Sequence, residues 1–209
     1  MTATFDSPWA STWADLRLAP PAGLLDELLR RYAEPHRRYH TRQHLEECLA
    51  LFARHRALAR RPGEVAIALW FHDAIYETTR GGNERASADW ARAVLREAAA
   101  SDDVAQRVDD LVMATRHDHV PVPADACLLV DIDLAILGAP RERFDEYERQ
   151  IRAEYAHVPE PIFREKRGEV LRAFLERPAI YATPALHDRL EAAARVNLAR
   201  AVADCAAGA

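Results

Sequence analysis

Residues 64–76, with the sequence EVAIALWFHDAIY, decide the fold. Apolar side chains cover almost the whole circumference of a helix built on this stretch, and such a helix belongs in the middle of a bundle. The longest uninterrupted apolar run, residues 65–71, is far shorter than the roughly 18 residues that a membrane span needs. We therefore expect this segment to be the buried central helix of a helical protein.

The sequence on both sides of this segment also favours helices. The chain of 209 residues has only 7 glycines, is rich in alanine and shows no sustained strand-like alternation. The expected helices are one carrying Leu24, Leu25, Leu28 and Leu29, one from Thr41 to a break at Pro62 and Gly63, the central one, two over 83–100 and 101–116, one over 124–137, a long one marked by Phe144, Tyr147, Ile151 and Tyr155, and two over 163–175 and 184–202. We expect an all-α, single-domain bundle of about eight helices spanning residues 1–209.

Composition excludes several classes of function. The 28 basic and 33 acidic residues are interspersed, with a net charge of -5, so nucleic acid is not an expected partner. Lys166 is the only lysine, which argues against lysine-based covalent chemistry. Cys48, Cys127 and Cys205 lack CxxC spacing, and the N-terminus lacks a signal-peptide pattern. We expect a cytoplasmic protein that does not bind membranes, and we leave open whether it forms a homo-oligomer.

The most informative residues are the neighbours His72 and Asp73 in the central segment. Burying an imidazole and a carboxylate among apolar side chains is costly unless they pair or bind a cation. His44, in YHTRQHLEECL, and Asp131 or Asp133, in LLVDIDLAILG, are further polar residues in apolar stretches. Two imidazoles and two carboxylates would form a mixed nitrogen and oxygen site suited to Mn, Fe, Co, Ni or Zn.

Five motifs carry a resemblance to a known family. They are YHTRQHLEECL (39–49), ALWFHDAIYE (68–77), NERASA (83–88), DIDLAILG (131–138) and IRAEY (151–155). In this order they resemble the HD-domain superfamily of metal-dependent phosphohydrolases, and more closely a bacterial group described only as predicted HD phosphohydrolases. The family motif is a histidine, a later His-Asp doublet and a distant aspartate. Here 28 residues separate His44 from His72, and 60 separate Asp73 from Asp133. The resemblance is strongest over residues 32–181.

The resemblance implies a metal site formed by His44, His72, Asp73 and one aspartate of the pair Asp131 and Asp133. Residues two apart on a helix point in different directions, so only one of the two aspartates should face the site. We favour Asp133, because the family's last aspartate is typically followed by an apolar run such as DLAIL. The implied cofactor is one divalent ion, with Mn, Co, Ni, Fe, Zn and Mg as the candidates.

The implied activity is hydrolysis of a phosphomonoester or diphosphate by attack of metal-bound water. The expected partner is a small phosphorylated substrate, and we favour a nucleotide. Asp73 can accept the proton of the water, while Glu84 in NERASA and His117 in MATRHDH are candidates for protonating the leaving oxygen. Arginines that can bind phosphate oxygens include Arg42, Arg116 and Arg167.

Two other functions remain as alternatives. A di-iron oxygenase of the HD type needs two additional ligands, for which only His117 and His119 are available, and two apart on a helix they cannot both point inward. A non-catalytic nucleotide sensor retains the pocket without turnover. Without the family resemblance, His72 and Asp73 also suit a structural pair at a helix C-terminus, and His40 suits a structural role beside His44.

Overall fold

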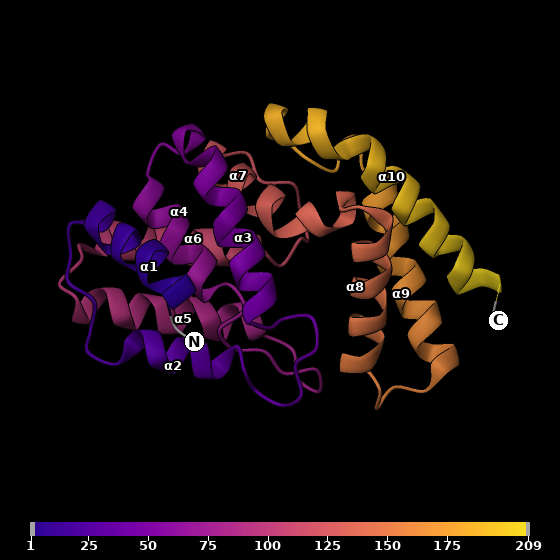
Figure 1. The fold of residues 1–209 in the computed structure, drawn as a ribbon, viewed down its shortest axis with the longest axis horizontal. Helices are drawn as coiled ribbons and strands as arrows, with labels where there is room; N and C mark the ends of the chain where they lie inside the picture. The colour runs from indigo at the N-terminus through magenta and orange to yellow at the C-terminus, as the bar shows by residue number, and fades with distance from the viewer. Residues whose placement is uncertain (1–2, 208–209) are drawn as a thin grey trace. The chain divides into compact units, whose positions relative to one another are not determined.

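The computed structural model describes residues 3–207, which form helices and no strands, so the all-α prediction is confirmed (Figure 1). The α-helices are α1 (Ala3–Leu16), α2 (Leu24–Arg31), α3 (Arg42–His55), α4 (Pro62–Phe71), α5 (Asn83–Glu97), α6 (Asp102–Ala114), α7 (Ala124–Asp133), α8 (Arg141–Glu154), α9 (Glu160–Leu175) and α10 (Pro184–Ala207). Two short 3-10 helices are η1 (Arg56–Leu58) and η2 (Leu134–Gly138). The chain divides into two compact units, Met1–Val130 and Asp131–Ala209. The single-domain organisation stays a prediction.

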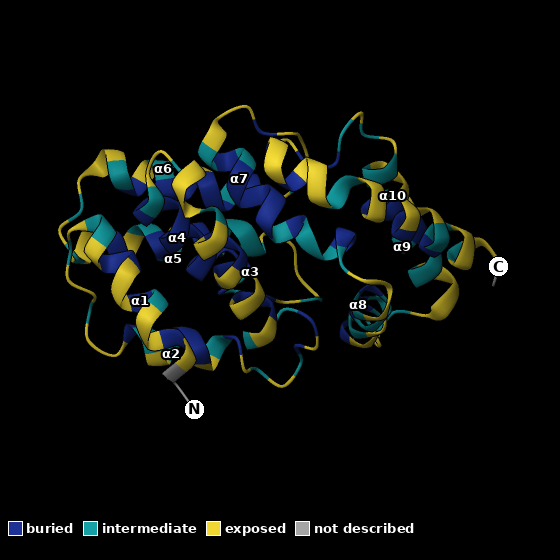
Figure 2. Ribbon diagram, turned by 45° about the horizontal axis from the view of Figure 1, so that its top comes forward, coloured by how far each residue is buried: buried dark blue, intermediate teal, exposed yellow. Residues whose placement is uncertain are grey.

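Helix α4 is the centre of the first unit, as the sequence predicts. Every residue from Gly63 to Phe71 is buried, and the helix packs against α1, α3, α5 and α6. Figure 2 shows α4 as buried, whereas α1 exposes one side. The apolar side chains around α4 are therefore covered by neighbouring helices on all sides.

The ends of α4 differ from the expected boundaries. Pro62 is the first residue of α4 and does not end the preceding helix, which already stops at His55. A side chain at Gly63 would place its Cβ 2.8 Å from the backbone nitrogen of Leu16, so this glycine permits close approach of the end of α1. The helix ends at Phe71, which leaves the following residues, His72 among them, in a turn.

Helix α1 is absent from the elements that the sequence predicts. Pro8 lies inside this helix and masks its pattern, but Phe5, Trp9 and Trp13 recur at four-residue spacing and are buried. The rings of Phe5 and Trp9 lie 5.7 and 5.0 Å from the ring of Trp70 in α4. The aromatic spacing is the signal that identifies this helix.

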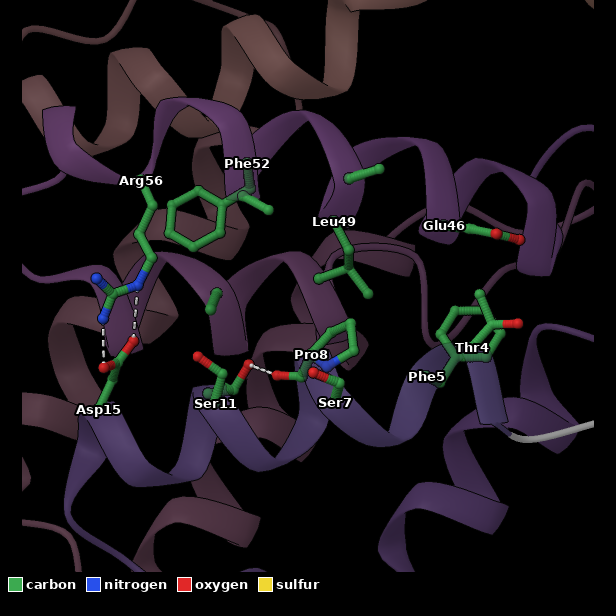
Figure 3. Close-up of a pocket in the computed structure, with 14 residues that line it drawn as sticks. Thr4, Phe5, Ser7, Pro8, Ser11, Asp15, Glu46, Leu49, Phe52 and Arg56 are labelled. Carbon is green, nitrogen blue, oxygen red and sulfur yellow. Dashed lines mark hydrogen bonds and ion pairs between the residues drawn. The ribbon is translucent and has the colours of Figure 1, made fainter.

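A groove runs between α1 and α3, above α4 (Figure 3). Phe5 and Pro8 line it from α1, and Leu49 and Phe52 line it from α3. An ion pair of Asp15 with Arg56 closes one end. Its lining is largely apolar and contains no cluster of histidines, so the candidate chemistry lies elsewhere in this unit.

The second unit is built around η2, which continues the chain after α7 where the sequence predicts helix up to residue 137. Helix α10 packs on η2 and on α9. A Cβ at Gly138 would lie 2.7 Å from the Cβ of Leu190, so this glycine permits close contact with α10. The buried Asn197 donates to the carbonyl oxygens of Leu137 and Ala139 at 2.9 and 3.0 Å. Among residues 3–207, no helix combines the length and apolar character needed to cross a membrane.

Candidate metal centre

Helix α3 presents the first histidine of the site. Thr41 is its N-cap, and the Thr41 side chain accepts a hydrogen bond from the backbone nitrogen of Gln43. Because the helix begins at this point, His44 and Cys48 lie one turn apart on the same face. Both side chains are buried against the central part of the unit. The buried face of α3 therefore carries both His44 and Cys48.

The turn after α4 brings two further side chains to His44. The Nε2 atoms of His44 and His72 lie 3.0 Å apart. The Oδ2 atom of Asp73 lies 3.1 Å from Nε2 of His72 and 3.4 Å from Nε2 of His44. Three of the predicted ligands thus form a triangle of donor atoms within the first unit.

The edges of this triangle suit one metal ion. Two ligand atoms that each lie about 2.1 Å from an ion stand about 3.0 Å apart at a right angle and about 3.4 Å apart at the tetrahedral angle. The three distances, 3.0, 3.1 and 3.4 Å, lie within this range. The residues present therefore fit a divalent cation that binds nitrogen and oxygen ligands.

The hydrogen bond of the other ring nitrogen fixes the tautomer of His72. Nδ1 of His72 lies 2.8 Å from the carbonyl oxygen of Leu69, which can only accept a hydrogen bond. Nδ1 therefore carries the proton, and in the neutral ring Nε2 keeps its lone pair for a cation. A backbone carbonyl that orients a histidine in this way is a common outer-shell feature of metal sites.

The charge state of Asp73 also suits a ligand. Burial raises the pKa of its carboxyl group, but the neighbouring His72, His40 and His44 together hold that pKa well below its usual range. Asp73 is therefore ionised at neutral pH and can only accept hydrogen bonds or bind a cation.

A buried arginine holds the turn in place. The Arg37 side chain is fully buried and donates to the carbonyl oxygens of Asp73 and Ala74 at 2.6 and 3.1 Å, and to that of His40 at 3.1 Å. Glu34 balances its charge at 3.0 Å. The guanidinium therefore satisfies backbone carbonyls of the turn after α4 and of the segment before α3. Arg37 could not be singled out from the sequence, because nothing in the pattern distinguishes it from the other arginines.

Tyr32 supports the same turn from α2's C-terminal side. Its hydroxyl donates to the carbonyl oxygen of Trp70 at 3.2 Å and accepts a hydrogen bond from the backbone nitrogen of Asp73 at 3.3 Å. Burial raises the pKa of Tyr32 to about 12, so the hydroxyl stays protonated at neutral pH. Tyr32 therefore positions Asp73.

His40 lies beside the donor triangle. Its half-buried ring stacks on Tyr76 with ring centres 4.1 Å apart, and its centre is 5.9 Å from that of His44. Its charge also lowers the pKa of Asp73. A structural role is predicted for His40, and the stacked ring is consistent with that role. The ring also lies next to the donor triangle.

The two aspartates near the end of α7 differ in their partners. The carboxylate of Asp131 accepts hydrogen bonds from the backbone nitrogens of Ala182 and Thr183, at 3.0 and 2.5 Å, just before α10 begins. Burial raises the pKa of Asp131, and these donors offset only part of the shift. Asp133 is half-buried. Asp131 thus caps within the second unit, and the role of Asp133 as a metal ligand stays a prediction.

The two predicted proton donors lie outside the donor triangle. Glu84 is half-buried in the first turn of α5, on the same side of the helix as Ser87, which hydrogen-bonds to Ile75 after the doublet. His117 is half-buried in the loop after α6 and has a left-handed backbone with φ of 58°. The roles of both residues stay predictions.

His119 lies near His117 but is exposed. The two residues are in a loop, so the expectation that they share a helix is wrong. Nδ1 of His119 lies 2.5 Å from a carboxylate oxygen of Asp118. The His119 ring therefore contacts Asp118 at the surface of the protein.

The arginines proposed for phosphate binding already have protein partners. Nε of Arg42 donates to the carbonyl oxygen of Leu29 at 2.8 Å, and Arg116 is exposed beside Asp118. Arg167 pairs with Glu148. Each keeps a structural contact, and their roles toward a phosphate stay predictions.

Cys48 is a further candidate ligand that was not predicted from the sequence. One ligand atom each of His44, Cys48 and His72 lies within 4.8 Å of the others. The four-residue spacing from His44 is the signal that identifies it.

Comparisons of this chain with protein-family models, with curated proteins and with solved structures found no match.

Proposed function

We propose that the protein is a metal-dependent phosphohydrolase that acts on a phosphomonoester or diphosphate, with a nucleotide as the favoured substrate. The observation that carries this proposal is the convergence of His44 Nε2, His72 Nε2 and Asp73 Oδ2 at 3.0 to 3.4 Å. The resemblance of the sequence motifs to the HD-domain superfamily supports it. When bound, a divalent cation polarises a phosphoryl oxygen and lowers the pKa of a coordinated water.

The protein's own side chains have distinct tasks in this proposal. His44 and His72 supply neutral nitrogen ligands, and the carbonyl oxygen of Leu69 keeps His72 in the binding tautomer. The ionised Asp73 offsets part of the cation's charge and accepts a hydrogen bond from the attacking water. Because Arg37 and Tyr32 hold the backbone of Asp73, this carboxylate is in position before substrate binds.

Asp133 is our proposed further ligand. The engagement of Asp131 with the backbone before α10 supports this choice, because a capping carboxylate is not free to bind a cation. Asp133→Asn should lower Co²⁺ affinity, whereas Asp131→Asn should leave it unchanged. Equal losses in the two variants would contradict the assignment.

Glu84 and His117 are the proposed proton donors to the leaving oxygen. Glu84→Gln and His117→Gln should each lower kcat while the bound metal content stays constant, since neither side chain is proposed to bind the ion. Their effects on kcat for a substrate with a highly acidic leaving group should be smaller, because such a group leaves without protonation.

The proposal is tested with metal analysis of the purified protein and a screen of nucleoside mono-, di- and triphosphates with Mn²⁺, Co²⁺, Ni²⁺ and Mg²⁺. His72→Ala should lose both bound metal and turnover, and the exposed His119→Ala serves as the matched control. Circular dichroism checks that both variants fold. If His72→Ala keeps its metal content and its turnover, the proposal is wrong.

Other results of the same screen separate the alternatives. Two iron ions per chain with an oxygen-dependent reaction would favour an oxygenase. Tight nucleotide binding without hydrolysis under every metal would favour a sensor.

The three cysteines are free thiols, which fits our proposal of a cytoplasmic location.

A further inference from the structure

Cys48 is a buried thiol in α3, one helical turn after His44. Its Sγ lies 3.7 Å from Nε2 of His44 and the same distance from Nδ1. It also lies within 4.8 Å of a ring nitrogen of His72. The thiol is therefore part of the same buried cluster as the two imidazoles.

We propose that Cys48 is a thiolate ligand of the metal centre and that the site consequently prefers a thiophilic ion, Zn²⁺ or Co²⁺, to Mn²⁺ or Mg²⁺. This inference rests on the cation site of the proposed function but not on the reaction. On ligation the S–H bond breaks, the proton leaves to solvent, and the sulfur electron pair binds the ion.

The geometry supports a sulfur ligand. With a metal–sulfur bond of about 2.3 Å and a metal–nitrogen bond of about 2.1 Å, nitrogen and sulfur ligands stand about 3.6 Å apart at the tetrahedral angle. The separation between Sγ of Cys48 and Nε2 of His44 is 3.7 Å. Because Sγ is equally far from Nδ1 and Nε2 of His44, the thiol lies over the face of the imidazole ring. A change of the Cys48 rotamer, with no change in α3 itself, would bring the sulfur to an ion bound at Nε2.

The chemistry of the donor set gives the preference among ions. Mg²⁺ and Mn²⁺ favour oxygen ligands, whereas thiolate combined with imidazole favours Zn²⁺ and its analogue Co²⁺. A set of two imidazoles, one carboxylate and one thiolate is softer than one of two imidazoles and two carboxylates. A thiolate from Cys48 should therefore raise the affinity of the site for Zn²⁺ and Co²⁺ relative to Mn²⁺ and Mg²⁺.

The competing explanation is that Cys48 is an ordinary core residue. It shares a buried face with Leu45, Leu49 and Phe52, and cysteine packs as a small apolar side chain. The hydrogen-bond contacts of Cys48 with described residues are nevertheless made to His44 alone. A direct measurement of a metal–sulfur bond distinguishes the two explanations.

The test is the absorption spectrum of the Co²⁺-loaded protein. A thiolate bound to Co²⁺ gives a sulfur-to-metal charge-transfer band in the near ultraviolet, which imidazole and carboxylate ligands do not give. The variant Cys127→Ser/Cys205→Ser leaves Cys48 as the only thiol, and it should retain the band. Cys48→Ser, which is nearly isosteric, should lose it.

Affinities provide a second readout. Cys48→Ser should weaken Zn²⁺ binding by at least the roughly 10–100-fold seen when outer-shell partners are removed. Mn²⁺ binding should change by less than about threefold, because a hard ion gains little from the thiolate. Because most sites already bind Zn²⁺ more tightly than Mn²⁺, the informative quantity is the change in the ratio of the two affinities between the wild type and Cys48→Ser.

Three results would overturn the inference. They are a Co²⁺-loaded wild-type protein without the band, a band that persists in Cys48→Ser, and a ratio of Zn²⁺ to Mn²⁺ affinity that Cys48→Ser leaves unchanged. In each case the proposed phosphohydrolase activity can still stand. A protein that binds no Co²⁺ at all contradicts both proposals, whereas a thiolate band without phosphatase activity contradicts only the proposed function.

Discussion

The turn after α4 and the last turn of α7 both place an aspartate at the end of an apolar helix, but the two carboxylates have different partners. Asp73 directs one oxygen at the imidazole nitrogens of His44 and His72. Asp131 accepts hydrogen bonds from two successive backbone nitrogens, those of Ala182 and Thr183. One side chain faces groups that can bind a cation, and the other completes the start of a helix.

The difference shows which contacts decide the charge state of a buried carboxylate. Burial raises the pKa of both Asp73 and Asp131. The histidines beside Asp73 outweigh that effect and hold its pKa low, whereas the backbone donors beside Asp131 offset only part of it. Neighbouring groups, more than burial itself, therefore separate a candidate ligand from a structural cap.

The largest effect on stability is expected from removing Arg37, which holds the turn after α4. Arg37→Ala leaves the carbonyl oxygens of Asp73 and Ala74 without their buried donor and leaves Glu34 without its partner. We expect a loss of about 3–5 kcal/mol in the free energy of unfolding, measured by urea denaturation. Arg37→Lys should recover little, because lysine lacks the planar fork that reaches these groups together.

The neighbouring arginine provides the control. Arg38 is exposed, and Arg38→Ala should change the free energy of unfolding by no more than about 0.5 kcal/mol. If Arg37→Ala were as stable as Arg38→Ala, the turn after α4 would not depend on the guanidinium, and the account of how Asp73 is positioned would fail.

The next effect concerns the ligand role of Asp73. Asp73→Asn keeps the shape of the side chain but removes its negative charge, so Co²⁺ affinity should fall by at least roughly 10–100-fold. Asp131→Asn should leave that affinity unchanged. Isothermal titration calorimetry measures both, and an unchanged affinity in Asp73→Asn would exclude Asp73 as a ligand.

Asp131→Asn should lower the stability of the protein although it leaves Co²⁺ affinity unchanged. In Asp131→Asn an amide NH₂ group must face a backbone N–H before α10, which leaves one donor unpaired. We expect a loss of about 1–3 kcal/mol in the free energy of unfolding. The exposed Asp188 in the first part of α10 offers a matched Asp→Asn control, which should be nearly neutral. Full stability of Asp131→Asn would show that this carboxylate does not cap α10.

The fold could be predicted from the sequence where the pattern is local and strong. Residues 64–76 specify the central helix because apolar side chains cover its whole circumference, and Thr41 marks the start of α3 by its capping chemistry. Helix α1 could not be recognised as readily, because Pro8 interrupts its pattern. The boundary at Gly63 depends on the approach of Leu16, a tertiary contact that no local pattern encodes.

The candidate site was predictable to a similar extent. Burying histidine and aspartate in apolar stretches pointed to His44, His72 and Asp73, since such groups require a compensating partner, and the resemblance to the HD-domain superfamily implied their role as ligands. The choice between Asp131 and Asp133 depends on the backbone at residues 182–183, some fifty residues away in sequence. Arg37 donates to backbone carbonyls. Because every residue has a backbone carbonyl, no sequence pattern reveals such a contact.

The smallest effect concerns the other side of the turn after α4. The buried Ser87 of α5 accepts a hydrogen bond from the backbone nitrogen of Ile75 at 3.0 Å. Ser87→Ala should cost about 1 kcal/mol in the free energy of unfolding, the usual net value of one hydrogen bond. Co²⁺ affinity should stay at the wild-type value, because Arg37 holds the carbonyls of Asp73 and Ala74 independently of α5. If Ser87→Ala instead lowered Co²⁺ affinity as much as Asp73→Asn does, the position of the carboxylate would depend on α5, and the role assigned to Arg37 would have to be shared with Ser87.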